Sequence, residues 1–225
     1  ELHLDVTHAR QITLCYERPV ASGACAPTPK LRTHGIRGAD ISGVRIFGCS
    51  LPEGACIGRE GDGLALVLQT MQVSRTMCSA FSLGAADTAL RLAIDFATTR
   101  VLYGEPAIAL PAVKREVRDA FVAIMLADAL AIFATRALSL MPEQMSVLSA
   151  VTKVAVPELS LEAIRRAAVV LGARHYMRGG RYGIFQKILR DAPLIALFDG
   201  SSAVNRSIVA GQLPRLVAAR LDETS

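Results

Sequence analysis

The chain has 225 residues, of which 52% are apolar and 20% charged, and its formal net charge at pH 7 is +5. This length and apolar content suit a globular protein with a sizeable core and exclude an intrinsically disordered chain. Charged residues interrupt the long apolar runs, so we expect a soluble protein without a membrane span. The arginines are dispersed and tryptophan is absent, which offers no stacking platform for nucleic acid.

Cysteine and histidine show no metal-ligand or disulfide spacing. The five cysteines include no CxxC pair, and the four histidines, at positions 3, 8, 34 and 175, include no HxxxH pair. We therefore expect reduced thiols, no metal and a cytoplasmic location. The chain opens Glu-Leu-His-Leu-Asp, which is not a secretory leader and is typical of the middle of a protein.

The first 60 residues predict β structure. Alternating or β-rich runs occupy residues 2–6, 11–16 and 44–47, with proline and glycine between them. We expect a partial antiparallel β domain over residues 1–60, too small to be stable alone.

From residue 61 the apolar spacing becomes helical. It predicts helices over residues 64–100, 111–140 and 143–171, the third kinked at Pro157, and a last helix after Gly200. In the second helix we expect the larger side chains to face inward: Val113, Val117, Phe121, Ile124, Leu130 and Phe133. The fold class predicted is α+β, mainly α, with an antiparallel four-helix bundle over residues 61–225.

Asp199 stands between an apolar segment and a flexible turn, in the run Leu-Phe-Asp-Gly-Ser-Ser that ends at Ser202. One interpretation is a helix cap, because aspartate, serine and glycine favour helix starts. The other is a working base, because an acid leaving a buried segment is partly desolvated. The two interpretations are compatible, and the residues by themselves leave both open.

Several motifs, taken in order, resemble the acyl-CoA dehydrogenase flavoprotein family. Val44-Arg-Ile-Phe47, Leu51-Pro52 and the glycine-rich run 57–63 are similar to the exit from that family's sheet. Arg75 then precedes the run Arg100-Val-Leu-Tyr-Gly104, which is similar to the family's Arg-x-x-Phe-Gly.

The last two motifs extend the resemblance to nearly the whole chain. Arg190-Asp-Ala192 and the run Phe198-Asp-Gly-Ser201 are similar to the family's Arg-Asp-Ala and Tyr-Glu-Gly-Thr. The resemblance implies α,β-dehydrogenation of an acyl thioester, carried by coenzyme A or by a carrier protein, with FAD as cofactor. A carboxylate removes the α proton, and the β hydrogen leaves as hydride to the flavin.

The resemblance also implies roles for individual residues. Asp199 takes the position of the catalytic base, and Arg75 and Phe198 take substrate positions. The implied cofactor positions are Arg100, Tyr103, Gly104, Gly172, Gly200 and Ser201. Of these, Arg100 and Tyr103 match positions that reach the cofactor of a neighbouring subunit, where an arginine fork suits a pyrophosphate.

The chain departs from the family in its base and in its extent. Aspartate stands where the family usually has glutamate, which retracts the carboxylate by about 1.5 Å. Ser74 stands at the alternative base position, so no second acid is at hand. The family's N-terminal helical domain and first strands have no counterpart, so we expect a partner chain or a severed segment to supply them.

Three functional hypotheses follow. The first is the C-terminal part or one subunit of a dehydrogenase that forms homodimers or homotetramers through its bundle and passes electrons to a flavoprotein or to oxygen. The second is a non-catalytic scaffold subunit of the same fold that acts in assembly. The third is an unrelated helical interaction domain.

Overall fold

The computed structural model describes residues 14–15, 25–47 and 53–222. The chain forms two compact units, residues 1–71 and 72–225, and the division falls inside α1 (Gly63–Met77). The domain boundary expected between residues 60 and 61 stays a prediction.

The first unit contains two small antiparallel pairings. Strand β1 (Leu14–Cys15) pairs with β4 (Cys56–Ile57), which follows the short 3-10 helix η2 (Glu53–Ala55). Strand β2 (Cys25–Pro27) pairs with β3 (Val44–Ile46), with Ala26 opposite Arg45. The expected run at 2–6 lies outside the described residues. Val44 and Ile46 are more than half exposed, so the described part of this hairpin buries little apolar surface.

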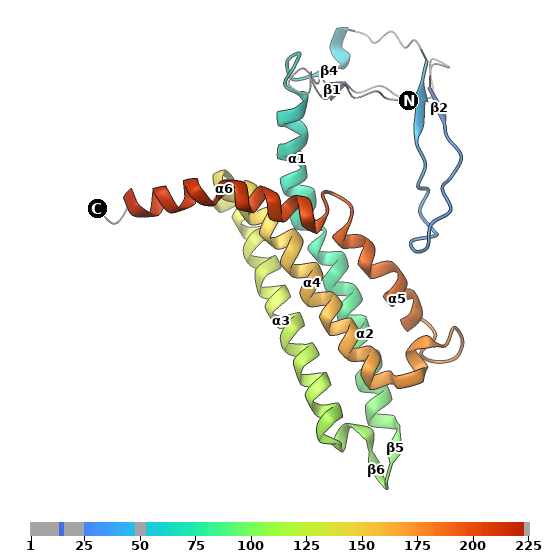
Figure 1. The fold of residues 1–225 in the computed structure, drawn as a ribbon. Helices are drawn as coiled ribbons and strands as arrows, with labels where there is room; N and C mark the ends of the chain where they lie inside the picture. The colour runs from blue at the N-terminus through green and yellow to red at the C-terminus, as the bar shows by residue number, and fades with distance from the viewer. Residues whose placement is uncertain (1–13, 16–24, 48–52, 223–225) are drawn as a thin grey trace. The chain divides into compact units, whose positions relative to one another are not determined.

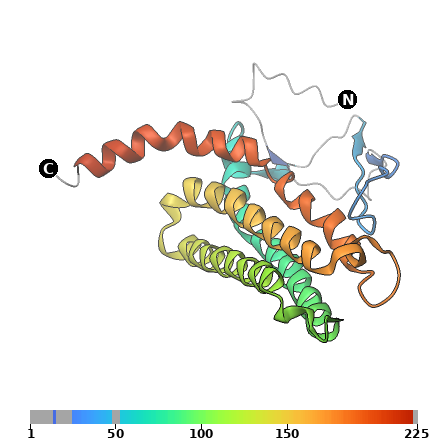
Figure 2. The ribbon, with the colours of Figure 1, turned by 60° about the horizontal axis from the view of Figure 1, so that its bottom comes forward.

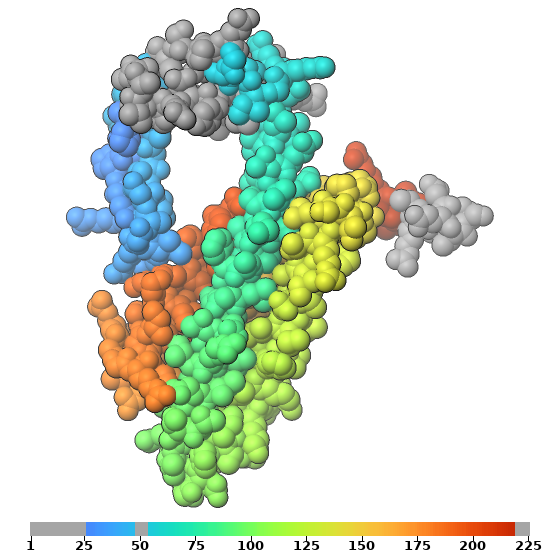
Figure 3. All heavy atoms as spheres, turned by 180° about the vertical axis from the view of Figure 1, so that it is seen from behind, coloured from blue at the N-terminus to red at the C-terminus, as the bar shows by residue number. Residues whose placement is uncertain are grey.

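The second unit is built on three long helices that run in alternating directions along one another (Figures 1 and 2). They are α2 (Ser79–Thr99), α3 (Pro111–Leu140) and α4 (Met145–Leu171). The connections are the hairpin β5 (Val101–Leu102) and β6 (Glu105–Pro106) with η3 (Ala107–Ala109), and then η4 (Pro142–Gln144). From behind, α2 and α3 lie side by side (Figure 3).

A smaller group of elements follows α4. It comprises η5 (Gly172–Tyr176), α5 (Phe185–Asp191), η6 (Ala192–Ala196) and α6 (Ser202–Asp222). Helix α6 packs against α4, and η6 packs against both α4 and α2. The predicted fold class, mainly α with small antiparallel sheets beside a helical bundle, is confirmed.

Helix α3 begins and ends at the predicted residues because prolines mark both boundaries. Pro111 occupies the first helical position, where its missing N–H is not needed, and Pro142 follows the last turn. Helix α4 runs from Met145 through Pro157 to Leu171 without an interruption in its assignment. Helix α5 was not predicted, because a seven-residue helix shows too little periodicity.

The predicted single helix over residues 64–100 is divided in two. Helix α1 ends at Met77 and α2 begins at Ser79, with Cys78 between them in right-handed helical geometry. The Cys78 amide still donates to the Ser74 carbonyl at 2.9 Å, so the break is local.

The inward face predicted for α3 was partly wrong. Phe121 and Phe133 are each about half exposed, and the buried face consists of alanines. These are Ala120, Ala123, Ala127, Ala131, Ala134 and Ala137. Small side chains let α3 approach α2 and α4 closely, which leaves Phe121 and Phe133 on its outer side. Val117, Ile124 and Leu130 do pack against the core, as predicted. Apolar spacing predicts which residues can face inward, whereas close packing between neighbouring helices selects small side chains at the tightest contacts.

Helix α3 is also the one described helix that is long and apolar enough to cross a membrane by length and composition. Its apolar stretch contains so few charged residues that it passes this test. This differs from the expectation that charged residues interrupt every long apolar run. Core helices of soluble proteins pass the same test, and α3 packs against α2 and α4 along its alanine face.

Candidate functional site

Asp199 lies at the turn between η6 and α6, in a backbone conformation that few residue types adopt. Its φ is +56°, and the following Gly200 has a φ of +91°. Aspartate is among the few non-glycine residues enriched in this left-handed region. Two consecutive positive φ values reverse the chain sharply and leave the half-buried Asp199 side chain at the apex.

Arg75 secures the backbone of this turn. Its side chain is 5% exposed, and its Nε donates to the Asp199 carbonyl at 2.7 Å. A charged donor makes this hydrogen bond stronger than a neutral one. Arg75 is therefore adjacent to Asp199, as the resemblance implies. Its predicted contact with substrate stays a prediction.

Cys78 lies one helical turn after Arg75 and reaches the carboxyl group of the same residue. The thiol is 4% exposed, and its Sγ is 3.6 Å from Asp199 Oδ2. Burial, together with the neighbouring Asp199 charge, raises the pKa of the Cys78 thiol to about 11. The thiol is therefore protonated at neutral pH and acts as the donor.

Lys153 enters the site from α4. Its side chain is 1% exposed, its ammonium donates to the Ile195 carbonyl, and its Nζ is 5.0 Å from the centroid of the Phe198 ring. Burial lowers the pKa of Lys153. Lys153 is not among the site residues predicted from the sequence. The available signal was a single cation within an otherwise apolar and hydroxyl-bearing helix face.

The segment after Asp199 is fixed by its own side chains. Asn205 is fully buried, and its Nδ2 donates to the carbonyls of Gly200 at 2.7 Å and Ser201 at 3.1 Å. The first turn of α6 is capped by Ser201, whose Oγ accepts from the Val204 amide at 3.4 Å. The residue that caps α6 is therefore Ser201 and not Asp199, and the Asp199 carboxylate faces Cys78 instead.

The predicted cofactor residues fall into separate places. Arg100, Tyr103 and Gly104 lie on the β5–β6 hairpin, where Tyr103 and Gly104 have φ values of +54° and +86°. Tyr103 is 94% exposed, and the Arg100 side chain has no hydrogen bond or ion pair among the described residues. Two positive φ values are typical of a tight hairpin turn and explain the glycine.

This hairpin lies far from the Asp199 turn. Cys78 and Arg100 flank the two ends of α2, and 21 residues of helix span about 32 Å. Gly172 ends α4 with a φ of +53°, and Gly200 and Ser201 lie beside Asp199. The fold therefore brings the predicted site residues together only in part. Gly200 and Ser201 lie beside Asp199, whereas Arg100, Tyr103 and Gly104 lie on the hairpin.

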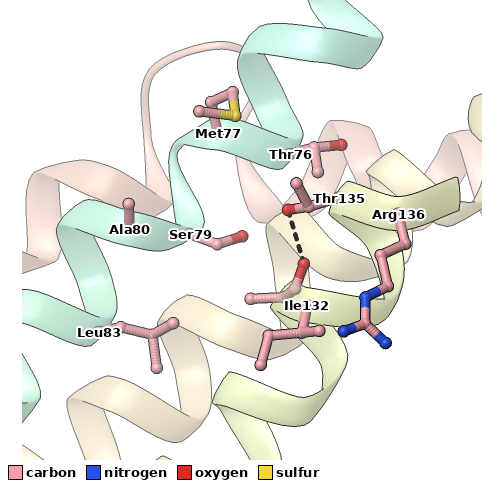
Figure 4. A pocket seen from close by; sticks show the side chains of 9 residues that line it. Thr76, Met77, Ser79, Ala80, Leu83, Ile132, Thr135 and Arg136 are labelled. Carbon is pink, nitrogen blue, oxygen red and sulfur yellow. Dashed lines mark hydrogen bonds between the residues drawn. The ribbon is translucent and has the colours of Figure 1, made fainter. Parts of the chain in front are cut away.

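A separate pocket of about 290 Å³ lies between the α1–α2 junction and α3 (Figure 4). It contains neither Asp199 nor Cys78. Its lining is Thr76, Met77, Ser79, Ala80, Leu83, Ala131, Ile132, Thr135 and Arg136. The Thr135 hydroxyl donates to the Ala131 carbonyl at 2.7 Å, so the pocket offers an apolar wall with few available polar groups. The Asp199 turn, and not this pocket, is the candidate catalytic site, because a carboxylate and buried charged groups converge there.

Within the described ranges, no group of three or more histidine, cysteine, aspartate or glutamate side chains has the geometry to hold a metal ion. The titratable groups at the Asp199 turn are one carboxylate, one thiol and two cations. This set suits proton transfer or anion stabilisation rather than metal binding.

The fold and this turn define a class: a helical-bundle protein that presents one carboxylate on a strained loop between its last two helices. Residues 61–213, 153 of the 225, match the family described as acyl-CoA dehydrogenase, C-terminal domain. The chain belongs to the acyl-CoA dehydrogenase family, and the resemblance drawn from the motifs is confirmed.

Curated relatives agree with this assignment. The chain is 26% identical over 183 residues to human mitochondrial short-chain specific acyl-CoA dehydrogenase, covering 80% of this chain and 43% of that protein. It is 27% identical over 179 residues to cyclohex-1-ene-1-carbonyl-CoA dehydrogenase of Geobacter metallireducens, covering 80% and 46%. The chain therefore spans less than half the length of these relatives.

Solved structures share the fold. Butyryl-CoA dehydrogenase from Megasphaera elsdenii superimposes with a TM-score of 0.85 at 20% identity, covering 91% of this chain and 52% of that one. A structure titled FAD-dependent dehydrogenase gives 0.77 at 24% identity, covering 84% and 50%. A prolyl acyl carrier protein oxidase gives 0.80 at 19% identity, covering 91% and 53%.

Proposed function

We propose that this chain is the C-terminal part, or one subunit, of a FAD-dependent enzyme that dehydrogenates an acyl thioester between its α and β carbons. Asp199 is the base that removes the α proton. The observation that carries the proposal is the Asp199 turn itself, where a left-handed backbone and Arg75 hold one carboxylate at the apex.

The backbone at Asp199 supports a second role. The Asp199 amide lies outside the helices and finds no acceptor among the described residues. An unpaired N–H beside the base is available to donate to the thioester carbonyl as negative charge develops on its oxygen. A single residue would then supply both the proton acceptor and a donor for the enolate oxygen.

The β5–β6 hairpin supports a contribution to FAD binding. Arg100 and the exposed Tyr103 are available to an anionic, aromatic ligand, and a guanidinium fork suits a pyrophosphate. The distance of about 32 Å along α2 favours a hairpin that serves the cofactor of a neighbouring subunit. FAD, when bound, accepts the β hydrogen as hydride.

The proposal extends to partners and location. We propose a homodimer or homotetramer, with the N-terminal part of the site supplied by a partner chain or an adjoining segment, and a flavoprotein or oxygen as electron acceptor. A structural neighbour titled as an electron transferring flavoprotein of Acidaminococcus fermentans shares the fold with a TM-score of 0.78. The Cys78 thiol, which forms no disulfide, supports a reducing, cytoplasmic location.

The test is Asp199→Asn in the complete, flavin-bound assembly. Removal of the base is expected to lower kcat for acyl-thioester dehydrogenation by roughly 10²- to 10⁴-fold, because general-base catalysis contributes on that scale. Asp199→Glu keeps a carboxylate and is the matched control, with activity retained. Undiminished activity of Asp199→Asn would remove Asp199 from this role. An assembly that binds no flavin and has no activity would favour the scaffold alternative.

A further inference from the structure

The Asp199 carboxylate is flanked by two buried side chains that the proposed reaction does not consume. Cys78 reaches Asp199 Oδ2 from the α1–α2 junction, with its Sγ at 3.6 Å. Lys153 reaches the preceding segment from α4, donating to the Ile195 carbonyl with its Nζ 5.0 Å from the Phe198 ring centroid. Both side chains are at least 95% buried, so their orientations are set by packing.

These two contacts act on different parts of the same loop. Arg75 holds the Asp199 carbonyl, which fixes the backbone but leaves the side-chain torsions of Asp199 undetermined. The Cys78 contact restrains the carboxyl group, and the Lys153 contact restrains the segment that leads to it. Lys153, on α4, is the cation that faces both the thiol and the carboxylate, and the Arg75 charge from α1 acts on Lys153.

We propose that Cys78 and Lys153 are positioning residues for Asp199, the thiol orienting the carboxylate and the ammonium holding its loop. This inference rests on the proposed function of Asp199 as base. A carboxylate one methylene shorter than glutamate reaches less far, so its orientation has a larger effect on proton transfer. A buried thiol donor at the α1–α2 junction, three residues after Arg75, supplies that orientation.

The first test compares Cys78→Ala with Cys78→Ser in the complete, flavin-bound assembly. Alanine removes the donor, whereas serine retains an O–H in nearly the same place. We expect Cys78→Ala to lower kcat roughly 3- to 10-fold, since a weak donor to a charged group is lost, with KM changed less than about twofold. Cys78→Ser is expected to restore most of kcat. Cys56→Ser, at an exposed thiol, is the matched control and should leave both constants unchanged.

Lys153→Met provides the second variant. It keeps an unbranched side chain but removes the donor to Ile195, so we expect kcat to fall roughly 10-fold, again with little change in KM. If Lys153→Met does not fold, the Cys78 series alone decides the proposal. Equal kcat in Cys78→Ala and wild type, or an increase in Cys78→Ala, would overturn it.

A third measurement does not depend on catalysis. Burial and then the Asp199 charge raise the pKa of the Cys78 thiol, so Asp199→Asn should lower that pKa while burial still holds it above the ordinary value of 9.0. The pH dependence of iodoacetamide incorporation at Cys78, followed by mass spectrometry, reports this shift, with Cys56 in the same sample as reference. An unchanged Cys78 profile would show that the two groups are not in contact.

The outcomes separate the two proposals. If Asp199→Asn is active and the Cys78 alkylation profile is shifted, Asp199 is not the base. The positioning role is then also contradicted, although the contact between Cys78 and Asp199 is confirmed. An inactive Asp199→Asn enzyme with an unaffected Cys78→Ala enzyme contradicts only the positioning role.

Discussion

At the scale of single residues, the Asp199 turn depends on two positions with left-handed backbone. Aspartate accepts such a φ with modest strain, and glycine accepts it with none. A Cβ on Gly200 would lie 3.2 Å from Arg75 Nη2 and 3.2 Å from Asn205 Nδ2. The turn therefore needs glycine both for its backbone and for the room that Arg75 and Asn205 take.

Gly200→Ala should destabilise the protein by about 1–3 kcal/mol, because it combines backbone strain with two tight contacts. Chemical denaturation measures the change. The control is Gly211→Ala within α6, where nothing lies within 4 Å of the added Cβ, and a gain of up to about 1 kcal/mol is expected. Equal effects of the two substitutions would contradict the assigned strain.

Stability should also depend on pH through Cys78. The folded-state pKa, about 11, lies above the unfolded value of 9.0, so the native state holds its proton more tightly. This stabilisation is present below pH 9 and is lost as the pH rises through 11. Between pH 8 and pH 10, the wild type should lose roughly 1 kcal/mol of unfolding free energy relative to Cys78→Ser, which does not titrate there. Urea denaturation at the two pH values measures the difference, and parallel behaviour of the two proteins would contradict the raised pKa.

At the scale of elements, the bundle is held by the alanine face of α3. Ala127 and Ala131 pack with Val156 of α4, and the flanking Leu83 and Leu159 fill the space around them. Small residues on one helix allow larger residues on its neighbours to interdigitate at interior density. On the outer side of α3, large apolar side chains such as Leu126 and Phe133 are about half exposed among the described residues.

Ala127→Leu should destabilise the chain by about 1–3 kcal/mol, because three added carbons have no room at a fully buried position. Ala129→Leu makes the same change two residues along α3 at an exposed position, and a change within about 0.5 kcal/mol is expected. Thermal unfolding of both variants, followed by circular dichroism, measures the contrast. An Ala127→Leu variant as stable as the wild type would contradict the close packing of α3 against α4.

At the scale of the whole molecule, the exposed apolar residues of α3 follow a helical spacing. Val122, Met125, Leu126 and Phe133 are each about half exposed and form one outer stripe. Contiguous apolar surface of this kind is typical of an interaction site. It supports the proposed homo-oligomer, in which the hairpin bearing Arg100 would meet a neighbouring subunit.

Leu126→Lys should shift the protein toward smaller species, because a charge at the centre of an apolar interface is left without a partner. Sedimentation velocity over a range of protein concentrations measures the change in mass. Thr88→Lys places the same charge at an exposed polar position of α2 and should leave the assembly unchanged. An unchanged mass in Leu126→Lys would show that this stripe is not the interface.

The sequence by itself determined the helical bundle, its family and the position of Asp199. The long periodic runs and the prolines beside α3 are local signals, and the ordered motifs from Arg75 to Ser201 gave the resemblance. Helix α3 consequently begins and ends where it was predicted to.

Only the tertiary structure decided what surrounds Asp199. Cys78 and Asp199 are 121 residues apart, and Lys153 and Ile195 are 42 residues apart, so no local pattern relates them. The alanine face of α3 likewise appears only when α2 and α4 pack against it, since hydrophobicity alone favours the larger side chains. These features arise from close packing between segments distant in sequence, which a single chain's periodicity does not encode.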